Sequence, residues 1–112
     1  MSRGAEELLR IVQELYPHQR IDLEHNVARH GSLFLDIYLP GLGLAFEYDG
    51  EQHFKYIEHF HGSRQGFAQA RKRDHDKDDR CDELKITLIR VAYNEEMSRD
   101  LVLDKIEEAL NV

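Results

Sequence analysis

Two short apolar segments, residues 33–39 and 44–48, flank the turn sequence PGLG at 40–43. Both segments are rich in residues that favour strands, and the proline and glycines between them favour a tight turn. Because nearly every position in each segment is apolar, the pattern predicts a β-hairpin whose strands are covered on both faces. This hairpin constrains the fold most, since other elements must pack on each side of it.

The hydrophobic pattern of the rest of the chain predicts helices and further strands around the hairpin. The expected elements are helices over 5–16, 63–84 and 97–110 and strands over 20–27 and 86–91. Ser2 is a candidate N-cap for the first helix, and Pro17 ends it because the residue before a proline is pushed out of the α region. Spacing of three and four residues places Asp74, Lys77 and Cys81 on one face of the middle helix. The order α, β, β, β, α, β, α predicts an α/β fold with a mixed sheet.

Length, charge and cysteine content narrow the class of protein. The chain of 112 residues suits a single domain over 1–112 and is too short for two. Its formal net charge of −7 argues against a basic protein that coats nucleic acid through bulk charge. The single cysteine, Cys81, cannot form an internal disulfide, and no apolar run approaches the ~20 residues of a membrane span. We therefore expect a cytoplasmic protein with no membrane contact.

Each strand of the predicted hairpin carries one acid in its middle, Asp36 in the first and Glu47 in the second. Antiparallel pairing with residue numbers that sum to about 83 sets these two side chains opposite each other, with Cβ atoms ~5 Å apart. Two carboxylates in a dry hairpin repel, so either one keeps a proton or a cation lies between them. Carboxylate pairs of this kind hold Mg²⁺. The alternative is that one acid faces solvent or bonds a neighbouring backbone group.

Polar residues follow the second strand directly, among them Gln52 and His53 after the flexible Gly50. A neutral imidazole at His53 could accept a proton from an attacking water, and an imidazolium could assist a departing oxygen. A structural or merely exposed histidine is the alternative interpretation.

A basic stretch, residues 64–73, stands out against the acidic background because it contains no acid. Its basic residues are Arg64, Arg71, Lys72 and Arg73. They are candidates for contacts to DNA phosphates, although a solvated helix face would give the same pattern.

Taken together, three segments resemble the restriction-endonuclease-like PD-(D/E)XK superfamily. They are LDIYLP at 35–40, AFEYDGEQHF at 45–54, and RDxxKD at 73–78 with the strand LIRV at 88–91. The chain is most similar to the branch of very-short-patch-repair-like nucleases and phage-associated homing endonucleases with an EDxHD-type site. The resemblance implies a core of αβββαβ order with a mixed central sheet flanked by helices. It also implies a metal-dependent endonuclease that hydrolyses phosphodiester bonds of double-stranded DNA with Mg²⁺ or Mn²⁺, in a bacterial or phage-infected cell.

The resemblance also assigns roles to individual residues. Asp36 matches the metal-binding aspartate, and Glu47 matches the second acid of the motif. His53 matches the histidine that follows this strand. The late acid from the next helix is Asp74 or Asp78.

Two positions depart from the pattern of the family. The lysine expected two residues after Glu47 is Asp49, so its role falls to His53, Gln52 or Lys77.

The acid expected in the first helix is the second departure, since Ala5 stands there and Glu6 lies one residue away. Either Glu6 takes the metal-binding role in a shifted register, or the first-helix acid is missing and metal binding is weaker. A catalytically weak or inactive DNA-binding or assembly module on the same fold is therefore the alternative function. An acidic interaction domain without nucleic acid is a third. Targeting could require a homodimer or a separate DNA-targeting partner.

Overall fold

The computed structural model describes residues 1–111 of the chain. Its elements are α1 (Arg3–Leu15), β1 (Asp22–Asn26), β2 (Phe34–Leu39), β3 (Leu44–Asp49), η1 (Glu51–His53), α2 (Glu58–His61), α3 (Arg64–Leu84), β4 (Thr87–Ala92) and α4 (Arg99–Leu110). The longer elements follow the predicted order α, β, β, β, α, β, α. The additions are the short helices η1 and α2 between β3 and α3.

The strands form a mixed sheet in the order β1-β2-β3-β4. β1 pairs antiparallel with β2, β2 pairs antiparallel with β3, and β4 runs parallel to β3. In the predicted hairpin Ile37 faces Phe46 and Leu39 faces Leu44, so the residue numbers of each pair sum to 83. The predictions of an α/β fold, a mixed sheet and this register are therefore confirmed.

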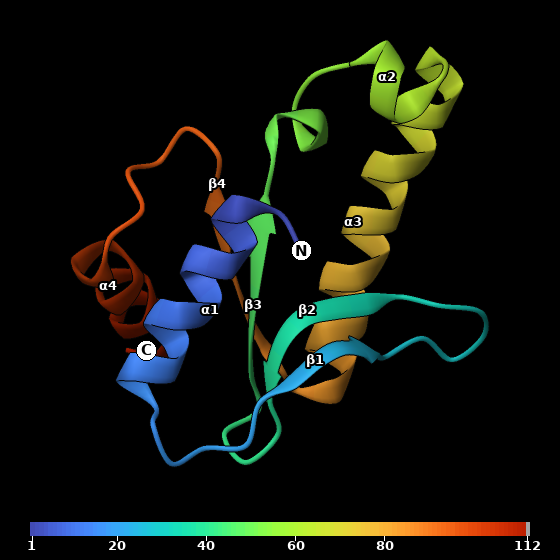
Figure 1. Cartoon of the computed structure of the whole chain (residues 1–112). Coiled ribbons are helices and arrows are strands. Elements are labelled where there is room, and N and C mark those ends of the chain that lie inside the picture. The colour runs from blue at the N-terminus through green and yellow to red at the C-terminus, as the bar shows by residue number, and fades with distance from the viewer. Residues whose placement is uncertain (112) are drawn as a thin grey trace.

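Helices cover both faces of the sheet, with α1 and α4 on one face and α3 on the other (Figure 1). The α1 and α4 face holds the larger hydrophobic cluster, which includes Leu8, Phe46, Val91 and Val102. The α3 face holds a smaller cluster around Leu35, Ala45 and Cys81. Because side chains alternate along a strand, neighbouring residues of β3 and β4 contribute to different clusters.

Serine side chains fix where the longer helices begin. Ser2 accepts a hydrogen bond from the N–H of Ala5, and Ser63 and Ser98 cap α3 and α4 in the same way. α3 ends at Leu84 and is capped by Lys85, whose φ of 59° places it in the left-handed region. No helix of residues 1–111 is long and apolar enough to cross a membrane.

Candidate functional site

Asp36 and Glu47 lie where β2 and β3 begin to separate. The backbone pairing of the two strands ends at Ile37 and Phe46. One residue further on, the N–H of Asp36 donates to the Oε2 of Glu47 at 2.8 Å instead of to a backbone carbonyl. The two acids thus meet across the hairpin, as the register predicted, with the Glu47 side chain only 4% exposed.

The cation beside this acid pair is the ammonium group of Lys77 from α3. Its Nζ lies 2.5 Å from the Oε1 of Glu47, and its side chain is 14% exposed. Of the residues that could replace the missing motif lysine, Lys77 is therefore the one that reaches the acid pair. Helical spacing had placed it on the same face as Cys81, which is buried against the sheet.

Asp36, the acid of the pair on β2, holds its proton unusually tightly. Burial, followed by the charge and hydrogen bonding of Glu47, raises the pKa of Asp36 to about 7, although Lys77 opposes the shift. Asp36 and Glu47 together carry less than two negative charges near neutral pH, because two carboxylates this close in a buried site repel each other. A proton on Asp36 and a cation on Glu47 together resolve the repulsion expected from the sequence.

His53 and Asp74 form a second pair beside the first. The η1 turn after β3 directs the Nδ1 of His53 to the Oδ2 of Asp74 at 2.8 Å, and the Oδ1 of Asp49 lies 3.8 Å from the same nitrogen. The hydrogen bond to Asp74 raises the pKa of His53. Burial raises the pKa of Asp74, but the hydrogen bond and charge of His53 lower it overall.

Arg90 from β4 joins this pair to the sheet. Its NH1 contacts Asp49 at 3.0 Å, and its Nε and NH2 contact the Oδ1 of Asp78 at 3.1 and 2.8 Å. NH2 also donates to the backbone carbonyl of Asp74 at 3.3 Å. Sequence reasoning missed this residue, although it is a lone charge within the apolar strand TLIRVA. That isolated charge, on the same face as Glu47 and Asp49, was the available signal.

The predicted metal ligands are brought together only in part. Asp36 and Glu47 meet, whereas Asp78 is engaged by Arg90. Residues 1–111 hold no group of three His, Cys, Asp or Glu side chains placed to bind a metal ion. A pair of carboxylates nevertheless fits Mg²⁺, which is commonly held by one or two carboxylates plus waters and phosphate oxygens.

Glu6 does not reach the acid pair. It is exposed in the first turn of α1, which packs on the sheet face opposite α3, and Ala5 beside it is buried. Gly4 allows the Tyr48 ring to lie directly against α1, because a Cβ at that position would overlap the ring. The first-helix acid of the family pattern therefore has no counterpart beside Asp36 and Glu47 among the described residues.

Beside the two pairs lies a hollow of about 300 Å³. We call it the basic hollow; it is lined by Gln52, His53, Phe60, His61, Ala70, Arg71, Arg73, Asp74 and Lys77. The structure thus brings Gln52 and two of the predicted basic residues to the same depression as Lys77 and His53.

The other two basic residues of the stretch 64–73, Arg64 and Lys72, have other surroundings. The guanidinium of Arg64 lies 4.6 Å from the ring centre of Tyr56. Lys72 forms an exposed ion pair with Asp76 at 2.9 Å. The predicted basic stretch is therefore divided, with Arg71 and Arg73 at the basic hollow and Lys72 directed elsewhere.

Comparison with known proteins finds viral relatives. The chain is 42% identical over 62 residues to uncharacterized protein 307L of Invertebrate iridescent virus 6, covering 55% of this chain and 32% of that protein. It is 30% identical over 101 residues to uncharacterized protein 033L of Invertebrate iridescent virus 3, covering 87% of this chain and 52% of that protein. It is also 43% identical over 63 residues to uncharacterized protein 094L of Frog virus 3 (isolate Goorha), covering 55% of this chain and 41% of that protein.

The chain therefore spans between 32% and 52% of the length of these curated relatives. No protein-family model matches the chain. No solved structure matches it.

Proposed function

We propose that this chain is a metal-dependent endonuclease that hydrolyses phosphodiester bonds in double-stranded DNA, built on a restriction-endonuclease-like core. The observation that carries the proposal is the meeting of Asp36, Glu47 and Lys77, which come from three different elements. Two acids and a lysine at the separating ends of two strands are the groups that the motif of the family requires. The αβββαβ element order supports the same proposal.

Asp36 and Glu47 would hold Mg²⁺, with Mn²⁺ as a substitute. When bound, the ion supplies positive charge that stabilises the phosphate during displacement. The raised pKa of Asp36 means that ion binding must displace a proton from this carboxyl near neutral pH. The Lys77 ammonium, which neutralises Glu47 in the metal-free chain, lines the basic hollow and can stabilise charge on a phosphate there.

His53 is the candidate general base. Its Nδ1 faces the Asp74 carboxylate, so the neutral ring carries its proton on Nδ1 and leaves Nε2 free to accept one from water. Asp74 positions the ring and stabilises the imidazolium that forms, as a carboxylate does for a catalytic histidine. Arg90 contacts Asp49 on β3 and the Asp74 carbonyl on α3, so it links the two elements on either side of His53.

DNA would approach over the basic hollow. Arg71 and Arg73 lie there with Lys77, so phosphate contacts and the proposed reaction centre share one depression. Because the relatives named above are proteins of animal viruses, the setting we propose is a virus-infected cell and not a bacterial or phage-infected one.

Nicking of supercoiled plasmid with Mg²⁺ or Mn²⁺ tests the proposal. The wild-type chain is expected to nick, and Glu47→Gln is expected to abolish nicking. Asp76→Asn removes an exposed carboxylate of α3 and should leave nicking unchanged, which makes it the matched control. A wild-type chain that binds DNA in Ca²⁺ but does not nick in Mg²⁺ would instead support the alternative, a DNA-binding module without activity.

A further inference from the structure

The two edges of the sheet are built differently. At the β1 edge Glu24 adopts a φ of 50°, and charged residues such as Asp22 interrupt the strand. β4, at the other edge, reads TLIRVA, with no proline, glycine or acid, and its one charge, Arg90, is paired with Asp49 and Asp78 of the same chain. Kinks and charges keep an edge strand from pairing with another chain, whereas a regular apolar edge invites pairing. The chain therefore protects one edge of its sheet and leaves the other regular.

Hydrogen bonds identify which backbone groups of β4 point outward. The N–H of Thr87 donates to the Gly43 carbonyl, and the N–H of Tyr93 donates to the Asp49 carbonyl, both at 2.8 Å. Because the N–H and C=O of one residue point to the same side of a strand, odd-numbered residues of β4 bond to β3. The backbone groups of Leu88 and Arg90 therefore face away from the sheet.

The outward-facing backbone N–H groups on either side of Leu88 and Arg90 are already hydrogen-bonded within the chain. The N–H of Ile86 donates to the Cys81 carbonyl at 2.8 Å. The N–H of Ala92 donates to the Oε1 of Glu95 at 2.9 Å. What remains is a short window of Leu88 and Arg90, whose backbone N–H and C=O groups have no partner within residues 1–111.

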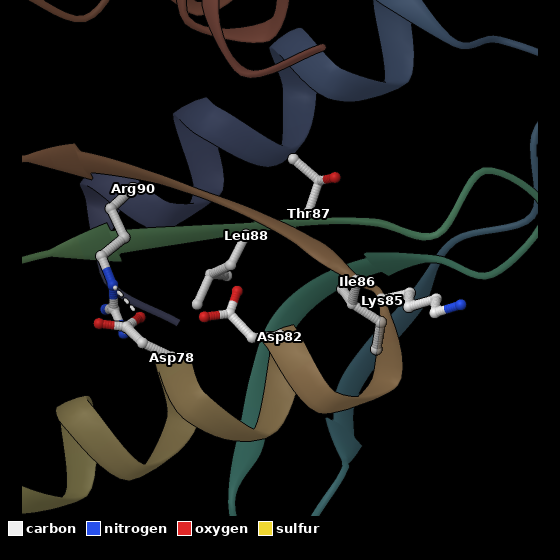
Figure 2. Close-up of a pocket in the computed structure, with 7 residues that line it drawn as sticks. All are labelled: Asp78, Asp82, Lys85, Ile86, Thr87, Leu88 and Arg90. Carbon is white, nitrogen blue, oxygen red and sulfur yellow. Dashed lines mark hydrogen bonds and ion pairs between the residues drawn. The ribbon is translucent and has the colours of Figure 1, made fainter. Parts of the chain in front are cut away.

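A groove runs along this window. It has a volume of about 680 Å³ and is lined by Asp78, Asp82, Lys85, Ile86, Thr87, Leu88 and Arg90 (Figure 2). We call it the β4 groove. One wall is the outer side of β4 and the other is the C-terminal half of α3. Arg90 reaches across it to Asp78, whereas Asp82 makes no ion pair with any described residue.

We propose that the β4 groove is a self-pairing surface, where two copies of this chain join their β4 strands antiparallel about a two-fold axis at Ile89. In this register Leu88 of one copy faces Arg90 of the other, and the reverse holds by symmetry. A residue pair of this type exchanges both backbone hydrogen bonds. The window of two open residues on each copy is therefore filled completely by the same window on the second copy, as an isologous interface requires.

Charge complementarity favours a second copy as the occupant. Asp82 lines the β4 groove beside Leu88 (Figure 2), and Leu88 is the residue that faces Arg90 of the other copy. A carboxylate without an ion-pair partner among residues 1–111 thus comes close to the Arg90 guanidinium of the second chain, which Asp49 and Asp78 of that chain hold on its other side. The apolar side chain of Leu88 packs against the aliphatic part of that arginine.

The pairing has a consequence for the whole assembly. A two-fold axis perpendicular to the sheet keeps the α3 helices of both copies on the same face. The acid pairs and basic hollows of both copies would then open on one side of a continuous sheet. The self-pairing rests on the β4 edge alone and does not depend on the proposed nuclease function.

Sedimentation equilibrium of the full chain at increasing concentration tests the proposal. The wild-type chain is expected to form dimers. Leu88→Pro removes an outward N–H, which an edge strand tolerates, and should raise the dimer dissociation constant roughly 10–100-fold through two lost hydrogen bonds. A chain that stays monomeric up to about 1 mM, or a dimer that Leu88→Pro leaves unchanged, would overturn the proposal.

A charge reversal provides a matched pair of variants. Asp82→Arg places like charges together at the two-fold interface and should weaken the dimer. Asp79→Arg changes the net charge equally at an exposed position outside the β4 groove and should not. Equal weakening by both variants would show that only overall charge matters and would overturn the proposed contact.

Hydrogen exchange of the backbone amides tests the pairing on the wild-type chain, and so does not depend on whether Leu88→Pro folds. The amide hydrogens of Leu88 and Arg90 should exchange more slowly as concentration rises. Those of Ile86 and Ala92 are already bonded and should not change. Exchange at Leu88 and Arg90 that is independent of concentration would contradict the pairing.

Discussion

The two faces of the sheet bury different kinds of side chain: one face buries apolar side chains and the other buries acids. On the α1 and α4 face, β3 contributes Leu44 and Phe46 to a cluster of apolar side chains. On the α3 face the same strand contributes Glu47 and Asp49, which are 3% and 6% exposed. One strand thus presents a dry hydrophobic surface on one side and two buried acids on the other, because successive side chains alternate.

Buried acids persist on the α3 face because cations from other elements reach them. Lys77 contacts Glu47, and Arg90 contacts Asp49. Within residues 1–111 every buried side-chain nitrogen or oxygen has a hydrogen-bond partner. Burial of the apolar face stabilises the fold, whereas burial of the charges on the polar face costs free energy of desolvation. The comparison teaches that the fold and the candidate chemistry depend on separate faces and should respond separately to substitution.

The largest effect on stability is expected on the apolar face. Phe46 is fully buried, so Phe46→Ala should lower the free energy of unfolding by about 3–5 kcal/mol through lost burial and the cavity left behind. Urea unfolding followed by circular dichroism measures this change. The matched control is Phe60→Ala, at a side chain 61% exposed, which should change stability by less than about 0.5 kcal/mol. Similar losses in both variants would contradict the assignment of the core.

The His53 pair should affect rate more than stability. His53→Ala is expected to lower kcat/KM roughly 10²–10⁴-fold, the usual contribution of a positioned base. Because Asp74 raises the pKa of His53 and the base acts when neutral, the rate at fixed metal occupancy should climb with pH through a midpoint above the ordinary value near 6.5. Asp74→Asn should move that midpoint to lower pH. If Asp74→Asn leaves the midpoint in place, the rise of the rate with pH belongs to a group other than His53.

Loss of the Lys77 ammonium should destabilise the polar face. Lys77→Met leaves the buried Glu47 carboxylate without its cation and should cost roughly 2–4 kcal/mol in unfolding free energy. Lys77→Met combined with Glu47→Gln should recover part of this loss. Lys72→Met breaks the exposed ion pair with Asp76 and should cost less than about 0.5 kcal/mol. Equal costs for the two lysines would mean that the Glu47 contact is not a buried ion pair in solution.

The smallest expected effect concerns DNA binding over the basic hollow. Arg71 and Arg73 together changed to glutamine should reduce the slope of log affinity against log salt by about two units, one for each lost phosphate contact. Lys72→Gln alone, on the neighbouring surface, should leave the slope unchanged. Fluorescence anisotropy of a labelled duplex in Ca²⁺ measures both. An unchanged slope for the double variant would place DNA on another face.

Local patterns were sufficient to predict the hairpin and its register. The tight turn at 40–43 sets Ile37 against Phe46, and the meeting of Asp36 with Glu47 followed from that register. The strand β1, which lies within the predicted range 20–27, and the α/β order were predicted in the same way, because each depends on residues close in sequence.

Contacts between distant elements could not be obtained from those patterns. Helical spacing placed Lys77 and Asp74 on one face of α3, but their partners depend on how α3 crosses the sheet. The role of Arg90 depends on the parallel register of β3 and β4, which fixes its position beside Asp49. Glu6 shows the same limit. It is one residue from the position where the family pattern expects an acid, yet α1 packs on the face of the sheet opposite α3.

The central claim is that the α3 face holds its acid pair, the proposed metal site, at a cost in stability. Between the ordinary aspartate pKa of about 3.9 and the raised value of about 7, the folded chain binds more protons at Asp36 than the unfolded chain. Stability should therefore fall as pH rises through this range. Asp36→Asn removes the titrating group, so the variant should lack this fall.

Urea unfolding at pH 8, with plasmid nicking in Mg²⁺ on the same samples, tests this claim most directly. The account predicts that Asp36→Asn is more stable than wild type by on the order of 1–3 kcal/mol, after allowance for solvent screening, and does not nick. A variant that is less stable than wild type at pH 8, or that nicks at the wild-type rate, would contradict it.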